Sequence, residues 1–487
     1  MVAPVLADQA EDAIRKFLRA TFDKRDAVLV IGPVAVRSST KSLSIAVTAA
    51  VLAGANLAIW FPGESGPDSD SQYAQAVAGH FDDWHPPIMA WLWSLLRLLA
   101  DGDGPMFCFQ VACYWLGFAL IAVALARAGR SHAAWAMLGV ALFPSMLMLN
   151  GVLLKDVGMG VTFLLGLAAL FCYRLQDRQV PAAIAAISLL LLVYGALVRA
   201  NAVCALVPLV AYMVRPLWLR RPWWLLAVSI PLSLALVPAA HFFNHRVLQA
   251  EPLHPIRSLQ IFDLTGIASY SADMAVFGTG NRFTRDEVDS CYSPAGWDRF
   301  APWGECRFFW NRLAVSADLQ ASVEELDSSS ALRAKPRSEL PDLWIAAIVR
   351  HPLAYAQHRL AHFSSEIWRG ASMAASDDAA PRSPGIVIYD LLTASALWLA
   401  VGAGLLIRLA FVRSAGAAAP IDAALALLLS GLTYGSVYLL IGVATELRYL
   451  FWTHIAIFTA LVISWPELRL SSATRLPSYA TQNVPAD

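Results

Sequence analysis

Charged side chains are scarce in this sequence. Asp, Glu, Lys and Arg make up 15% of its 487 residues, whereas soluble globular proteins carry about 25%. The deficit is uneven, because charges are missing from long blocks and crowded between them. A charge at the centre of a membrane helix costs about 2.5–3.5 kcal/mol on insertion scales. Apolar blocks of about 20 residues therefore predict membrane spans rather than buried helices of a soluble protein.

A net charge is also absent, because 36 basic residues balance 36 acidic ones. Without an excess of positive charge, no nucleic-acid partner is predicted. Cysteine is sparse as well, with six residues in the chain. Four of them lie inside apolar blocks, where a free cysteine packs as a small hydrophobic side chain. No internal repeat is visible.

What is present is a series of apolar blocks. They predict an all-α integral membrane protein with about ten transmembrane helices, at residues 42–61, 106–126, 132–150, 157–173, 180–198, 202–214, 223–242, 387–411, 420–441 and 447–465. The predicted domains are an N-terminal tail (1–41), an N-terminal transmembrane module (42–242) containing a first outer loop (62–104), an outer domain (243–386), C-terminal transmembrane helices (387–465) and a C-terminal tail (466–487).

Basic residues fall in alternate connections between these blocks. The N-terminal tail is basic, and so are the later connections that hold Arg127, Arg130, Arg174, Arg178, Arg215, Arg220, Arg221 and Arg413. Lys and Arg mark cytoplasmic loops, so both termini are predicted to be cytoplasmic. The opposite connection, residues 62–85, has five acidic residues and no Lys or Arg, and is predicted to lie on the outer side.

The segment 86–100 is apolar but only about 15 residues long. If it crossed the membrane, every later Arg-rich connection would move to the outer side. Its Trp and Leu content is typical of a helix lying in the interface, and residues 70–81 predict a second such helix. In the outer domain we expect a helix pair near 341–369, and loops with short helices from 270 to 340.

The two remaining cysteines, Cys291 and Cys306, are the only ones in the outer domain. The outer compartment is oxidising, and disulfides persist there. A disulfide between them is therefore predicted, with two free thiols as the alternative.

Ionisable residues gather at the outer ends of the predicted spans. They are Asp68, Asp70, Asp83 and His85 in the first outer loop, Lys155 and Asp156 before the fourth span, Arg199, and Arg448 beside Glu446 before the last span. Ionisable groups at membrane depth point to function. Carboxylates can act as bases and cations can hold phosphate, so a phosphorylated substrate is predicted.

These residues include a pattern similar to a known superfamily. Asp70-Ser-Gln-Tyr73 followed by Asp83-Trp-His85-Pro-Pro resembles the first outer loop of GT-C glycosyltransferases, a group that includes protein O-mannosyltransferases and lipid A aminoarabinose transferases. Asp156 at the start of a later span, and Arg448-Tyr449 near the last spans, resemble further features of that group. Where members often have Asp-Glu, this chain has Asp70-Ser71, and Asp68 forms an Asp-x-Asp instead. The resemblance covers residues 42–175 well and the rest loosely.

The resemblance implies a transferase of the bacterial inner membrane with its active site on the periplasmic side. The donor would be a polyprenyl-phosphate sugar, and the acceptor a hydroxyl of a glycan, lipid or protein, attacked with inversion. Asp70 and Asp156 would be catalytic, and the substrate would be bound by Asp68, Tyr73, His85, Lys155, Arg199 and Arg448. Whether a Mg²⁺ or Mn²⁺ ion takes part stays open, with Asp68, Asp70 and Asp156 as its ligands if one is bound.

Simpler roles exist for each residue. Asp70 could cap a helix N-terminus, Arg199 could reach toward the interface, and Arg448 could only pair with Glu446. A transporter of lipid-linked glycans and a polysaccharide polymerase or ligase are alternative functions. Transporters usually show inverted repeats and broken helices at the midplane. Only a transferase should release polyprenyl phosphate from its donor.

Overall fold

The computed structural model describes residues 36–218, 222–278, 283–316, 327–368, 384–413 and 419–473. Within these ranges the regular structure is helical, and extended segments form only isolated bridges. Most of the two predicted tails, and Arg220 and Arg221, lie outside the described residues.

Six helical segments are long and apolar enough to cross a membrane. They are α2 (Val36–Trp60), α5 (Gly104–Arg127), α8 (Lys155–Arg174), the run Leu226–Val247 through α11 (Pro222–Leu234), α12 (Leu236–Phe242) and η1 (Phe243–Val247), then α22 (Ala419–Ile441) and finally η5 (Leu447–Leu450) with α23 (Phe451–Ala473). The described chain is thus an all-α protein of the multi-pass membrane type.

The other predicted spans are helical but shorter or broken. Helices α6 (Ser131–Ala141) and α7 (Pro144–Asn150) form one apolar pair bent by 57°, since Pro144 cannot continue the hydrogen-bond ladder of α6. Three more apolar helices are α9 (Ala182–Val198), α10 (Ala202–Trp218) and α21 (Ser395–Arg413), the last preceded by α20 (Pro384–Thr393). Their apolar parts are no longer than 17 residues. All ten predicted blocks are therefore helical, and six of them are full-length candidates for spans.

Helix α8 occupies the centre of the bundle. Of its apolar window, 78% is buried inside the protein, against 22% for α2. A side chain at Gly117 of α5 would meet Leu164 of α8 at 2.8 Å, and one at Gly160 of α8 would meet Phe451 of α23 at 2.8 Å. Glycine lets membrane helices approach this closely. The start of α8 is consequently held in a fixed place.

Two short helices follow α2 at one end of the bundle. Helix α3 (Pro67–Ala78) begins with a proline at its first position and ends at Gly79, whose φ of 66° is left-handed. Helix α4 (Ile88–Leu96) has nine residues and is about 14 Å long, too short for a core of about 30 Å. As predicted, residues 86–100 do not cross the bundle, although both helices differ from the expected bounds by a few residues.

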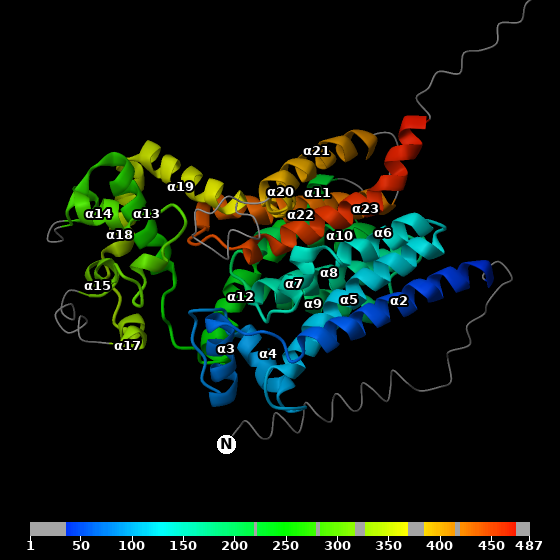
Figure 1. Ribbon diagram of the computed structural model, residues 1–487, viewed down its shortest axis with the longest axis horizontal. Coiled ribbons are helices and arrows are strands. Elements are labelled where there is room, and N and C mark those ends of the chain that lie inside the picture. Colours follow the sequence, from blue (N-terminus) through cyan, green and yellow to red (C-terminus); the bar gives the residue numbers. More distant parts are fainter. Residues whose placement is uncertain are drawn as a thin grey trace, which may run out of the picture.

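A separate domain lies beyond α3 and α4 at that same end of the bundle (Figure 1). We call it the polar domain: α13 (Ile256–Ser271), η2 (Met274–Phe277), α14 (Arg285–Cys291), η3 (Asp298–Phe300), α15 (Phe308–Leu313), α17 (Ser328–Arg333), α18 (Leu340–Arg350) and α19 (Pro352–Ile367). It has its own hydrophobic core. The expected helix pair is α18 and α19, whereas the central helix α13 was not foreseen.

A disulfide joins the predicted pair, Cys291 and Cys306, with an S–S distance of 1.98 Å. The bridge closes a loop that contains Trp297, Asp298 and Trp303. Gly296 of this loop forms a bridge with Ala444, and the Trp297 N–H donates to the Val443 carbonyl at 2.8 Å. The loop is therefore fixed against the segment that connects α22 to η5.

Candidate functional site

A cavity of about 830 Å³ lies where the helix bundle meets the polar domain. Its walls come from the first loop, the ends of α8 and α9, helix α12, the segment between α22 and α23, and the polar domain. The acidic, basic and amide side chains that line it are Asp68, Asp83, His85, Lys155, Arg199, Asn201, His241, Asn244, His245, Asp298, Glu446 and Arg448. Residues distant in sequence thus line one cavity that is open on part of its surface.

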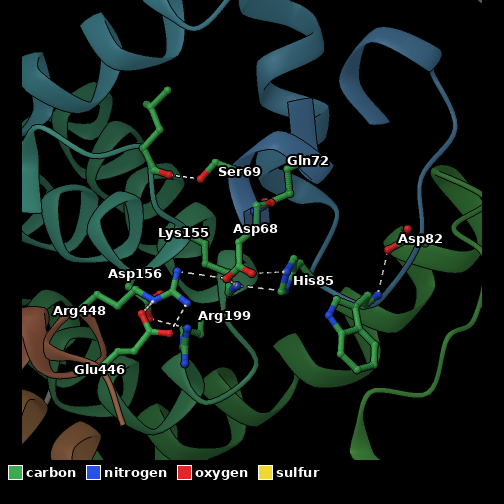
Figure 2. Close-up of polar contacts among 12 residues, drawn as sticks. Asp68, Ser69, Gln72, Asp82, His85, Lys155, Asp156, Arg199, Glu446 and Arg448 are labelled. Atoms are coloured by element: carbon green, nitrogen blue, oxygen red, sulfur yellow. Dashed lines mark hydrogen bonds and ion pairs between the residues drawn. The ribbon is translucent and has the colours of Figure 1, made fainter. Parts of the chain in front are cut away.

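Local contacts bring α3 to the start of α8. The Ser69 hydroxyl donates to the Leu153 carbonyl, and the Leu153 N–H donates to the Glu64 carbonyl at 2.8 Å. Ser69 is fully buried, as is most of the α3 face that holds it. The residue before it, Asp68, consequently faces Lys155, the first residue of α8 (Figure 2).

The Asp68 carboxylate is the centre of a polar cluster. Its Oδ2 lies 3.0 Å from Lys155 Nζ and 3.1 Å from Arg448 Nη1, and its Oδ1 lies 3.4 Å from His85 Nε2. Burial by itself would raise the pKa of this carboxyl. The hydrogen bond from His85 and the two neighbouring cations outweigh burial, so the pKa is held well below its usual value. Asp68 is therefore ionised at neutral pH.

His85 orients the Asp68 carboxylate from the other side. Its Nδ1 lies 3.0 Å from Lys155 Nζ, and an ammonium group can only donate. Nδ1 is therefore the acceptor, and the ring proton sits on Nε2, facing Asp68. Burial, followed by the Lys155 charge, lowers the pKa of His85. The imidazole is thus neutral at pH 7 and acts as a bridge between Lys155 and Asp68.

Asp156 is fully buried behind the cavity wall. Its Oδ1 lies 2.5 Å from Arg199 Nη1, and the Arg199 guanidinium lies 4.7 Å from the ring centre of Tyr449 and 5.8 Å from that of Tyr438. Such stacking suits a planar guanidinium. Arg199 lines the cavity, but Asp156 does not. In this arrangement Asp156 positions Arg199.

Arg448 links two carboxylates. It binds Glu446 through Nε at 2.6 Å and Nη2 at 2.9 Å, while its Nη1 reaches Asp68. Burial raises the pKa of the Glu446 carboxyl, although Arg448 opposes this effect. The cluster therefore holds three cations, Lys155, Arg199 and Arg448, and the three carboxylates of Asp68, Asp156 and Glu446.

Two predicted site residues lie outside this cluster. Asp70 is exposed, and its Oδ1 accepts a hydrogen bond from the Ser65 hydroxyl at 2.7 Å. The Tyr73 hydroxyl accepts from the Gly102 N–H at 3.1 Å, and its ring packs 5.3 Å from that of Trp93. Tyr73 thereby joins α3 to α4. The carboxylate of the first loop that reaches Lys155 is that of Asp68, not that of Asp70.

The three carboxylates considered for a metal are not gathered as a ligand set. Asp68 faces Lys155 and Arg448, Asp156 pairs with Arg199, and Asp70 is exposed on α3. Within the described ranges, no group of three or more His, Cys, Asp or Glu side chains suits a metal ion. Divalent cations need several oxygen ligands, so we derive no step through a metal.

The cavity wall formed by the polar domain could not be predicted from periodicity or motifs in the sequence. Trp297, Asp298 and Trp303 come from the disulfide loop, which has no periodic pattern. Asp83 also lines the cavity; its carboxylate accepts from the Leu253 N–H at 2.5 Å and lies 3.6 Å from His245 Nε2. The sequence feature that pointed to this wall was the clustering of Trp residues between two cysteines.

Comparisons of this chain with protein-family models, with curated proteins and with solved structures gave no match. We therefore infer function from the residues and the geometry described above.

Proposed function

We propose that this protein is a membrane glycosyltransferase of the GT-C type. It would move a sugar from a polyprenyl-phosphate donor to an acceptor hydroxyl, with inversion at the anomeric carbon. The observation that carries the proposal is the convergence of Lys155, Arg199 and Arg448 with the Asp68 carboxylate in one cavity. Oriented cations stabilise a departing phosphate, and a nearby carboxylate can take a proton.

The cavity also suits a donor with a lipid tail. One side of it is apolar and is formed by Ala196 and Leu197 of α9, Leu236, Val237 and Ala240 of α12, and Ile441 of α22. Val237 and Ile441 are exposed on the helix surface. A polyprenyl chain could leave the cavity between these helices while its phosphate stays with the cations.

In the proposed reaction, Asp68 is the base. The acceptor oxygen attacks the anomeric carbon, the bond from that carbon to the phosphate oxygen breaks, and the acceptor proton passes to Asp68. The leaving polyprenyl phosphate gains negative charge, which Lys155 and Arg448 stabilise. His85 holds the carboxylate in place, and Asp156 acts through Arg199.

The resting ion pairs suggest an order of events. Asp68 now neutralises Lys155 and Arg448, and a donor phosphate would compete with it for both cations. Once the phosphate has taken them, the carboxylate keeps the hydrogen bond from His85, which is the largest influence that lowers its pKa, but loses the contribution of the two cations. Its basicity then increases when an acceptor has to be deprotonated.

The experiment compares Asp68→Asn with Asp70→Asn. Purified protein in liposomes receives polyprenyl-phosphate sugars, and polyprenyl phosphate release and acceptor gain are followed by mass spectrometry. Loss of a general base should cost about 10²–10⁴-fold, so Asp68→Asn should be nearly inactive and Asp70→Asn close to wild type.

Two outcomes contradict this proposal. If Asp70→Asn is inactive and Asp68→Asn is active, the base is the other carboxylate. If the wild-type protein releases no polyprenyl phosphate but moves lipid-linked glycans across the liposome membrane, it is a transporter.

A further inference from the structure

Three tryptophans form one wall of the cavity. Trp84 comes from the first loop, and Trp297 and Trp303 come from the disulfide loop. Their ring centres lie 5.7–6.1 Å apart in all three pairs. Trp310, fully buried, packs behind Trp84 and Trp297 at 6.2 and 5.9 Å. We call Trp84, Trp297 and Trp303 the tryptophan wall.

Two of the three rings of the wall come from a tightly packed loop, and one of these two is partly exposed. The Cys291–Cys306 disulfide closes the loop, and the Cys306 N–H donates to the Arg299 carbonyl at 2.8 Å. A side chain at Gly304 would meet the Asp298 carbonyl oxygen at 2.4 Å. Although this loop is tightly packed, Trp303 remains 51% exposed. A preorganised aromatic surface can bind at low entropic cost.

Carboxylates accompany the tryptophan wall. Asp83 adjoins Trp84, Asp298 adjoins Trp297, and both side chains line the cavity. Asp298 also interacts electrostatically with Asp68 and Arg448. The wall is therefore near the cluster that would hold the donor, so a molecule resting on it would approach the Asp68 carboxylate.

Aromatic rings beside carboxylates suit a pyranose ring. The face of an indole is negative and attracts the weakly positive C–H groups on the apolar face of a sugar. Carboxylates only accept hydrogen bonds, which sugar hydroxyls can donate. A few placed polar groups on an apolar surface are typical of small-molecule sites.

We propose that the tryptophan wall is the acceptor subsite and that the acceptor is a carbohydrate whose pyranose ring rests on Trp303. This inference rests on the proposed function, because it names the acceptor class of the same site. It excludes a polypeptide or a glycerolipid hydroxyl as the main acceptor.

The binding test does not depend on the donor. Full-length protein in nanodiscs is titrated with cellotriose, maltotriose, mannotriose and chitotriose, and binding is followed by saturation-transfer NMR. At least one triose should bind, with contacts to the C–H face of a ring. Trp303→Ala should weaken that binding about tenfold, whereas Trp303→Phe should retain most of it. Trp135→Ala removes an exposed tryptophan of α6 and serves as the control.

The transfer test separates the two proposals. If the wild-type protein cleaves no polyprenyl-phosphate sugar, the proposed function fails, while triose binding still decides whether a carbohydrate subsite exists. If cleavage is stimulated by a Ser/Thr peptide or a glycerolipid but by no triose, the carbohydrate acceptor is wrong. Equal triose binding by Trp303→Ala and wild type would also overturn it.

Discussion

Arg448 shows why the type of cation matters at this site. Its guanidinium bonds to Glu446 with two nitrogens and to Asp68 with the third. A lysine keeps the positive charge but has no planar fork. It could not hold two carboxylates in the same geometry.

Arg448→Lys should therefore lower kcat about 10- to 100-fold, and Arg448→Ala should lower it further. Steady-state kinetics of polyprenyl phosphate release would measure both. Arg333→Lys is the matched control, because Arg333 pairs with Glu251 on the exposed surface. Unchanged kinetics for both Arg448 variants would remove this side chain from the site.

The pair Asp68 and Asp70 marks how far sequence could define the site. Two residues of rotation along a helix amount to about 200° about its axis. Asp68 and Asp70 therefore point to nearly opposite sides, and only one of them can face the cluster. The choice depends on where α3 begins and which face it buries, and Ser69, Gln72 and Gln75 form that face. The Asp-x-Asp pattern alone does not indicate which of its two carboxylates faces the cluster.

At the scale of elements, α19 connects the polar domain to the cluster. Glu366 Oε2 accepts from the Glu446 N–H at 2.9 Å, and Arg359 Nη1 donates to the Gly442 carbonyl at 2.6 Å. Both residues are almost fully buried. They fix the segment that presents Glu446 and Arg448 to the cavity.

Glu366 is accordingly a positioning residue. Glu366→Ala should lower kcat about tenfold with little change in KM, because Arg448 would lose its fixed place. Glu366→Gln retains an oxygen acceptor and should recover most of the activity. If the Gln and Ala variants lose activity equally, or only the melting temperature changes, α19 has no positioning role.

The folding stability of the protein should also depend on pH through His362 of α19. Burial, which is the largest influence, lowers the pKa of His362 to about 4, below the unfolded value of about 6.5. Between these values the unfolded chain binds a proton that the folded chain does not. Stability should therefore fall as the pH drops from about 6.5 toward 4.

His362→Asn should make that dependence less steep, because an amide can donate to the Pro294 carbonyl as His362 Nδ1 does at 2.8 Å but does not titrate. Thermal unfolding followed by tryptophan fluorescence at pH 7.5 and 5 would measure it. His80→Asn, at an exposed position, should keep the wild-type slope. If the change of stability with pH is the same in His362→Asn and wild type, His362 is not a source of the acid sensitivity.

Composition predicted the helices well, because an apolar block and the residues at a helix end act through local sequence. Ten apolar blocks became helices, and Pro67 and Gly79 delimit α3 as such residues do. Lys155, Arg199 and Arg448 could be grouped from sequence because all three lie at predicted span ends on one side. The tryptophan wall could not, since Trp84 and Trp303 meet through tertiary contacts that leave no period in the sequence.

The whole molecule has a testable orientation. Arg130 and Arg178 follow α5 and α8, and basic loops stay in the cytoplasm. Reporter fusions after either residue should indicate the cytoplasm, and fusions at Gly66 or Ser329 the opposite side. An outside signal after Arg130 would reverse the cluster and exclude a periplasmic site.

The apolar side of the cavity determines which concentration governs the reaction. If the donor enters between α12 and α22, it arrives by lateral diffusion and never dissolves in water. Occupancy then depends on the number of donor molecules per lipid, not per litre. Adding inert phospholipid at constant total donor would dilute the substrate, and KM becomes a mole fraction of the bilayer.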